Sequence, residues 1–192
     1  MSEKFIAPAA ATLLAVARET KPDQLAAPTP CAEYDVRALV NHLLFWGPSL
    51  VGAGRKELVP PPAGSESDVD LAGGDWLAAL ERHVGELVAV WSEPAAWQGV
   101  TRMGGELELP GDLVGGMVTG ELVLHGWDLA RATGQRPEWD EGLAEFVYAE
   151  VARTADQGRA LGVYGPATTA AADASALDRA LALSGRDPAW TA

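Results

Sequence analysis

Three residues that can bind protons or metal ions are spaced for one helix face: Glu121, His125 and Asp128. At about 100° per residue, offsets of four and seven return to roughly +40° and −20° of the starting direction, so the three side chains share a face. Their neighbours are mostly apolar, so this face is expected to point into the protein interior. Buried carboxylates and imidazoles are costly unless they are paired or bind a metal ion. The spacing therefore predicts a polar site inside the fold.

A further candidate, His42, lies in an amphipathic segment that begins near Asp35. If the two helices meet in a bundle, His42, Glu121 and His125 provide two imidazoles and one carboxylate. Catalytic zinc sites use such a set and leave one coordination position open, and iron or nickel suits the same ligands. Spacing alone leaves another interpretation open, in which His42 is a core histidine and Glu121 and His125 are a simple i, i+4 pair.

The remaining polar candidates have two interpretations each. Asp128 either orients a ligand imidazole through a hydrogen bond or pairs with a cation such as Arg131. Cys31 precedes a helix whose N-terminal field would lower a thiol pKa, or it is a small buried residue. His83 has no ligand-like spacing around it, so we expect a core or surface residue there.

The elements that must position these residues are mostly helical. Apolar residues recur at helical spacing over five long segments and one short one: 5–19, 35–52, 75–91, 112–133, 140–160 and 175–184. The stretch 100–109 is typical of a small β-hairpin. The polar segment 56–74 contains three consecutive prolines and is expected to be an exposed, mobile loop. The predicted fold is all-α, a four-helix bundle with short C-terminal helical additions in one domain that spans 1–192.

Composition excludes several classes of partner. The formal net charge of −13 argues against nucleic-acid binding, which needs a basic surface. A single cysteine rules out an intrachain disulfide and is typical of the reducing cytoplasm. We expect no secretory signal and no membrane span, because the sequence lacks an apolar run of about 18 residues. A homodimer through exposed helix faces is compatible with the sequence, although no apolar stripe demands one.

Two long motifs resemble a known family. They are Pro-Thr-Pro-Cys-Ala-Glu-Tyr-Asp-Val-Arg-Ala-Leu-Val-Asn-His-Leu at 28–43 and Glu-Leu-Val-Leu-His-Gly-Trp-Asp-Leu-Ala-Arg-Ala-Thr-Gly at 121–134. With the ending at 183–190, they resemble an actinobacterial metal-binding family. It belongs to the superfamily of DinB-like proteins and the N-terminal domain of mycothiol-dependent maleylpyruvate isomerase. The resemblance implies an up-down-down-up four-helix bundle that holds a divalent metal ion, with zinc expected and nickel or iron as alternatives. The implied ligands are His42, Glu121 and His125, with Asp128 at an acidic position of the same motif.

The resemblance also implies a function. We expect a thiol-dependent transferase or isomerase that acts on a small electrophile, with mycothiol as cosubstrate in an actinobacterial cell. Two alternatives are a non-enzymatic metal-binding bundle and a hydrolase that uses metal-bound water. The isomerase often carries an arginine two residues before the motif glutamate, and this chain has Thr119 there. For that reason the isomerase's dicarboxylate substrate is not carried over to this chain. The first motif also has Tyr34 where tryptophan is usual, a mild aromatic substitution.

Overall fold

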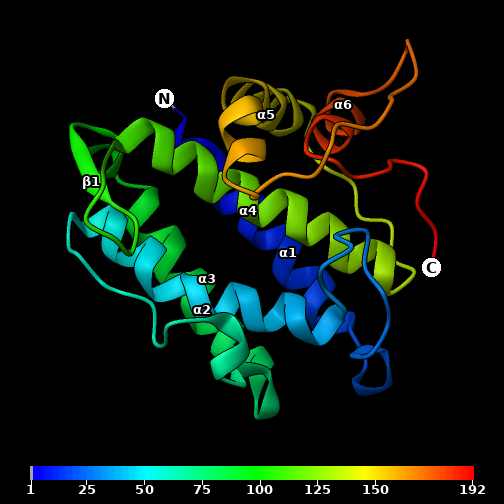
Figure 1. The fold of residues 1–192 in the computed structure, drawn as a ribbon, viewed down its shortest axis with the longest axis horizontal. Helices are drawn as coiled ribbons and strands as arrows, with labels where there is room; N and C mark the ends of the chain where they lie inside the picture. Colours follow the sequence, from blue (N-terminus) through cyan, green and yellow to red (C-terminus); the bar gives the residue numbers. More distant parts are fainter. Residues whose placement is uncertain (1) are drawn as a thin grey trace.

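The computed structural model describes residues 2–192, and α-helices form most of it (Figure 1). The helices are α1 (Ile6–Glu19), α2 (Val36–Arg55), α3 (Trp76–Trp91), α4 (Gly111–Ala132), α5 (Glu141–Ala160) and α6 (Ala176–Leu183). Strands β1 (Val100–Arg102) and β2 (Glu108–Pro110) pair antiparallel, with Thr101 opposite Leu109. Short 3-10 helices lie in the connections: η1 (Glu3–Phe5), η2 (Pro22–Gln24), η3 (Glu66–Asp68), η4 (Leu71–Gly73) and η5 (Pro94–Trp97). The predicted all-α class, the helix positions and the hairpin are confirmed.

Local chemistry explains where the site-bearing helices begin and end. The Asp35 side chain accepts a hydrogen bond from the Ala38 backbone N–H at 2.8 Å and so caps the start of α2, as expected. Gly134 follows α4 with φ of 74°, a conformation that favours glycine and ends the helix. Pro48 lies inside α2 and removes one backbone donor, but the helix continues for about two more turns to Arg55.

Contacts between helix ends give the direction of the first three helices. Arg18, near the end of α1, pairs with Glu81 in the first half of α3 at 2.7 Å, so α1 and α3 run antiparallel. Trp91, the last residue of α3, donates to the backbone oxygen of Leu50 near the end of α2 at 2.9 Å. Helices α2 and α3 are therefore parallel, and the long connection between them is required by this geometry.

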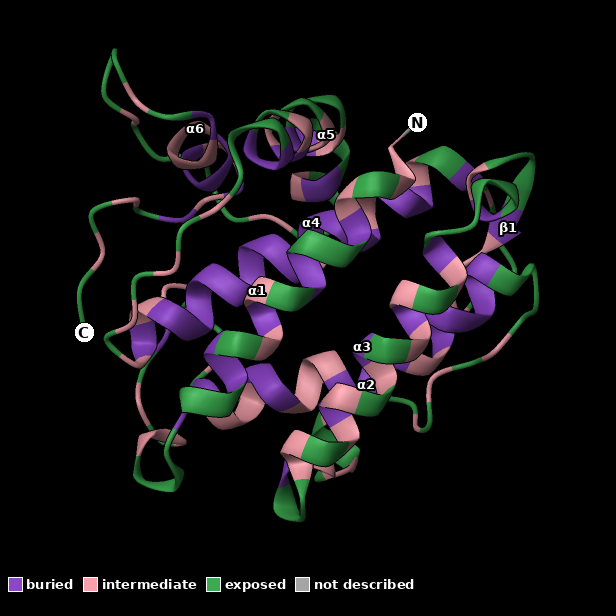
Figure 2. Cartoon of the chain, turned by 180° about the vertical axis from the view of Figure 1, so that it is seen from behind, coloured by how far each residue is buried: buried purple, intermediate pink, exposed green. Residues whose placement is uncertain are grey.

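Helix α4 completes the bundle and lies at its centre. Gln135, just after α4, donates to the backbone oxygen of Val16 near the end of α1 at 3.0 Å, so these helices are parallel. The order is therefore up-down-down-up, as the resemblance implied. Helix α4 is buried on most of its surface (Figure 2), because α1 and α2 pack against it from the bundle and α5 covers it from outside. A polar side chain on α4 consequently needs a partner inside the protein.

The C-terminal segment returns to the bundle after α6, which packs on α5 (Figure 1). Gly185 has φ of 93°, and a Cβ there would lie 2.7 Å from the Cα of Gly165. Glycine at 185 allows this close approach, which leaves Arg186 only 6% exposed. Within residues 2–192, no helix has both the length and the apolar character needed to cross a bilayer.

Candidate metal centre

Three of the predicted site residues come together between α2 and α4: His42, Glu121 and His125. The Nε2 atom of each histidine lies 3.3 Å from Oε2 of Glu121. One ligand atom from each residue lies within 4.8 Å of the other two. Two donors on one tetrahedral zinc ion, with bonds of about 2.0–2.1 Å, lie about 3.3 Å apart. The types and spacing of these donors fit a divalent metal ion.

His125 is oriented by a carboxylate on its other ring nitrogen. Its Nδ1 lies 3.0 Å from Oδ2 of Asp128, one turn further along α4. When Nδ1–H donates to this carboxylate, the lone pair of Nε2 is left facing Glu121, which is the tautomer that a ligand histidine needs. Asp128 is 0% exposed. It lies where a carboxylate that orients the His125 imidazole must lie.

A buried arginine balances the charge of Asp128. Arg186 donates through Nε to Oδ1 at 2.8 Å and through Nη2 to Oδ2 at 2.7 Å, a bidentate pair. Burial opposes ionisation of Asp128, but the positive charge of Arg186 and hydrogen bonds from His125 and Arg186 together outweigh it and lower the pKa of the carboxyl group. Arg131, the partner suggested by spacing, instead donates to the backbone oxygen of Trp190. Sequence reasoning assigned no role to Arg186, because helix periodicity says nothing about where a residue beyond the last helix packs.

His42 has an equivalent arrangement, with a different carboxylate. Its Nδ1 lies 3.0 Å from Oε1 of Glu66 and 3.0 Å from the hydroxyl of Tyr34. Trp46 donates to the same Glu66 oxygen at 2.8 Å. Burial opposes the charged imidazole, but hydrogen bonds to Glu121 and Glu66 outweigh it and raise the pKa of His42 to about 10. Two carboxylates therefore hold a proton on His42 that a metal ion would have to displace.

Glu66 belongs to a segment that the sequence suggested was an exposed loop, and that interpretation is wrong at this residue. The Glu66 side chain is 26% exposed. Asn41 on α2 fixes the segment by donating to the backbone oxygen of Glu66 at 3.0 Å and accepting from the backbone N–H of Leu71 at 2.7 Å. Nothing in the local pattern separates Glu66 from the other acidic residues of 56–74, so the sequence carries no signal for its role.

Glu121 is the negative centre of the group. Burial opposes its ionisation, but the His125 charge and hydrogen bonds from both histidines hold the pKa of its carboxyl group well below the usual range. One carboxylate oxygen of Glu121 thus faces the Nε2 atoms of two imidazoles. Each contact is favourable when that nitrogen carries a proton or when a metal ion lies between the nitrogen and the oxygen. This requirement matches a divalent cation in chemistry as well as in spacing.

A cavity of about 350 Å³ opens beside the three side chains. Its lining comes from the segment before α2, from α2, η3, the hairpin and α4, and from the chain after α5 and α6. Cys31 lies in this lining, and burial raises the pKa of its thiol. Burial is thus the largest influence on this thiol, which favours the interpretation of Cys31 as a small, largely buried residue. The cavity leaves the side of His42, Glu121 and His125 that faces it accessible to a small molecule.

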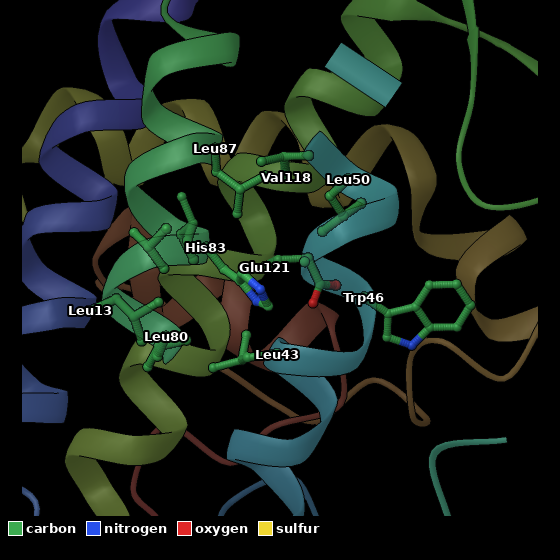
Figure 3. Close-up of a pocket in the computed structure, with 12 residues that line it drawn as sticks. Leu13, Leu43, Trp46, Leu50, Leu80, His83, Leu87, Val118 and Glu121 are labelled. Carbon is green, nitrogen blue, oxygen red and sulfur yellow. The ribbon is translucent and has the colours of Figure 1, made fainter. Parts of the chain in front are cut away.

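A second, much smaller cavity of about 20 Å³ also borders Glu121 (Figure 3). Leucine and valine side chains form most of its wall, and His83 from α3 reaches it. The Nδ1 atom of His83 is buried and has no hydrogen-bond partner among residues 2–192. It would lie 3.1 Å from a Cβ at position 47, so Gly47 makes room for the ring against α2. His83 is not part of the convergent donor set.

Comparison with protein families identifies one match. The family model of the mycothiol maleylpyruvate isomerase N-terminal domain matches residues 6–130, which include all three candidate ligands. Uncharacterized proteins of Mycobacterium tuberculosis strains CDC 1551 and H37Rv are each 31% identical to this chain over 134 residues. That alignment covers 68% of this chain and 66% of each relative's length. No solved structure gives a significant match.

Proposed function

Because the chain belongs to the mycothiol maleylpyruvate isomerase N-terminal domain family, we propose that it is a metal-dependent enzyme that uses a small thiol. In this proposal His42, Glu121 and His125 hold a divalent ion, with zinc as the first expectation and nickel or iron as alternatives. The reaction is transfer of the thiol to a small electrophile, or a thiol-dependent isomerisation. Mycothiol is the thiol that the family name suggests.

One observation carries the proposal: the three donors converge beside a cavity of about 350 Å³. A purely structural ion would need no such space next to its ligands, because structural sites are closed by a fourth protein side chain. Volumes from about 300 Å³ upward are typical of small-molecule sites. The geometry therefore favours an enzyme over a bundle in which the ion only joins α2 to α4.

The residues of the chain have distinct tasks in this proposal. Asp128 and Glu66 each hold an Nδ1–H and thereby turn the opposite nitrogen of His125 and His42 toward Glu121. Arg186 keeps Asp128 ionised inside the protein. Apolar side chains that line the rest of the cavity provide a surface for the second substrate.

A bound divalent ion would lower the pKa of a thiol at its open position, so that the thiolate nucleophile is available at neutral pH. No side chain of the cavity then has to act as a general base, since the thiol proton leaves when the thiol binds. We expect this chemistry to take place in the cytoplasm, where low-molecular-weight thiols are kept reduced.

The first experiment joins elemental analysis to a thiol-conjugation assay on the purified protein. We expect about one equivalent of divalent metal and product formation that requires both mycothiol and an electrophile such as monobromobimane. Cysteine and glutathione at the same concentration test which thiol is used. The His125→Ala variant should lose both the metal and the thiol-dependent rate, whereas Arg153→Ala, at an exposed ion pair, should keep both.

Three results would overturn the proposal. A protein that contains no stoichiometric divalent metal after mild isolation has lost the basis of the site. A metal-loaded protein that hydrolyses activated esters without any thiol, and conjugates no thiol to any electrophile of the panel, is a hydrolase. A metal-loaded protein with neither activity is the non-enzymatic alternative.

A further inference from the structure

The cavity beside the candidate metal ligands has two unlike walls. One wall carries the three candidate ligands and the side chains that orient them. The other wall extends along α2 and α4 from the ligands and includes the hairpin and the loop after α5, and its side chains are largely apolar. They are Trp46, Leu50, Met103, Met117, Leu124 and Val163. A molecule that reaches the polar wall must therefore lie against the apolar one.

Electric charge in the cavity is predominantly negative. Three carboxylates line it, those of Glu33, Glu66 and Glu121. Arg186 is the one Lys or Arg among the described residues of the lining, and its guanidinium is already used. Its Nε and Nη2 donate to Asp128, and its Nη1 donates to Ser184 at 3.1 Å. The Arg186 side chain is only 7% exposed.

A metal ion does not reverse this balance. The two positive charges of a divalent ion are fewer than the three negative charges of the lining carboxylates, and the Arg186–Asp128 pair is neutral. A thiolate at the open position would add a further negative charge. An anionic second ligand would meet repulsion in a site where water screens little.

Methionine supplies an unusual share of the apolar wall. The sequence has three methionines, of which Met103 and Met117 both line this cavity and the third is residue 1. Met103 follows β1, and Met117 lies on α4. Unbranched thioether side chains change rotamer at little cost and adapt to ligands of different shape. The wall is therefore suited to a class of apolar molecules more than to one rigid compound.

We infer that this cavity binds an uncharged, largely apolar small molecule and excludes anions. The inference deepens the proposed function and rests on it only in identifying this molecule as the electrophile. The preference for neutral ligands follows from the walls themselves. It also separates the chain from a dicarboxylate isomerase. Once a thiolate holds the open metal position, the lining has no unpaired Lys or Arg for either charge of such a substrate.

The test uses two aromatic probes of nearly the same shape, methyl 1-naphthyl sulfone and 1-naphthalenesulfonate. The first is neutral, the second carries one negative charge, and neither is a strong ligand for zinc. Binding is measured by calorimetry on the full chain as isolated, with the metal content determined on the same sample. We expect the neutral sulfone to bind at least about tenfold more tightly than the sulfonate.

Two substitutions place a cation in the apolar wall from different elements: Met117→Lys and Met103→Lys. Each should weaken binding of the neutral sulfone and strengthen binding of the sulfonate. The ratio of the two affinities should therefore fall toward one or reverse. Leu107→Lys adds the same charge to the hairpin at a position that is 69% exposed and outside the cavity lining. It should leave the preference unchanged, and circular dichroism verifies that all three variants are folded.

The outcomes separate this inference from the proposed function. Equal or tighter binding of the sulfonate to the unmodified protein, or a preference that neither methionine variant alters, overturns the inference even if metal and thiol activity are present. Conversely, a protein without metal that still prefers the neutral sulfone, and loses that preference in Met117→Lys, retains the binding site and loses the proposed chemistry.

Discussion

His125 and His42 present the same nitrogen to Glu121 at the same distance, but the carboxylates behind them are held in different ways. Asp128 lies on the same helix as His125, is fully buried and is clamped by Arg186. Glu66 comes from a short 3-10 helix in a long connection and is 26% exposed. The His125 side is therefore fixed by the fold before any ion binds. The His42 side depends on a loop, and this side is expected to respond to pH and ligands.

The largest effect should follow removal of either imidazole. His125→Ala and His42→Ala each leave two of three donors, and we expect the metal content to fall from about one equivalent to near zero. Thermal unfolding should then occur at lower temperature, because bound metal stabilises the folded state. Elemental analysis and calorimetry measure the two quantities. A variant that keeps its metal removes that histidine from the ligand set.

The clamp on the His125 side gives the next largest effect. Arg186→Leu leaves Asp128 buried without its cation, which should reduce the free energy of unfolding by about 3–5 kcal/mol. For a chain of this size the melting temperature should fall by roughly 6–20 °C. Arg153→Leu, at a pair that is 42% and 19% exposed, is the matched control and should cost less than about 1 kcal/mol. Equal losses in the two variants would contradict the view that the His125 side is preorganised by Arg186.

The pKa of Asp128 adds a pH dependence to this comparison. Because its pKa is lowered in the folded protein, its contribution to stability is present at neutral pH and is lost as pH falls through the folded pKa. The difference in free energy of unfolding between the unmodified protein and Arg186→Leu should therefore become smaller on acidification. The ordinary pKa of this carboxyl group is 3.8, so the loss begins below that value. Urea unfolding of both proteins at about pH 6 and at about pH 2.5 measures the difference.

On the His42 side, pH should change metal affinity. The folded pKa of about 10 lies above the value of about 6.5 for a free imidazole. Protonated His42 therefore stabilises the metal-free protein fully below about pH 6.5, and this contribution is lost as pH rises through 10. Metal must displace that proton, so the affinity should rise by about tenfold per pH unit between pH 7 and 9. Competition with a chelator of known pH dependence measures the slope, and a flat profile would contradict it.

Glu66→Gln should have a smaller effect. Loss of the carboxylate behind His42 should weaken metal affinity by about tenfold, because the amide orients the imidazole less strongly. The melting temperature of the metal-free protein should fall by less than in Arg186→Leu, since Glu66 is partly solvated and shares the His42 proton with Glu121. Glu86→Gln, at an exposed pair with Arg55, is the control. A large loss of stability in Glu66→Gln would remove the difference between the two sides.

The two sides also differ in how far the sequence predicts them. Helix periodicity places Glu121, His125 and Asp128 on one face, and the bundle brings His42 to them, so the donor set follows from regular structure. Arg186 and Glu66 come from irregular segments, whose packing depends on tertiary contacts such as Gly185 against Gly165. A buried Asp128 requires a cation, but the chain has 14 Lys and Arg residues. Spacing along α4 offered only Arg131, as one of several alternatives, and Arg131 donates to the backbone oxygen of Trp190.

The smallest expected effect belongs to the third histidine. His83 lies near Glu121, across a cavity of about 20 Å³ that is large enough for about one water molecule (Figure 3). It makes no hydrogen bond to any of the three donors among the described residues, so His83→Ala should leave the metal content at one equivalent. The metal affinity of this variant should stay within about threefold of that of the unmodified protein, a change of about 0.7 kcal/mol or less.

Two further variants at this position and beside it make the comparison sharper. His83→Phe keeps a ring of similar size without a buried nitrogen, and it should match or exceed the stability of the unmodified protein if the orphaned Nδ1 is a cost. Gly47→Ala pushes the ring away from α2 and should destabilise through packing alone. Loss of metal in His83→Phe, measured by elemental analysis, would mean that support for the site comes from α3 as well. The contrast between a clamped His125 and a loop-held His42 would then describe only part of the site.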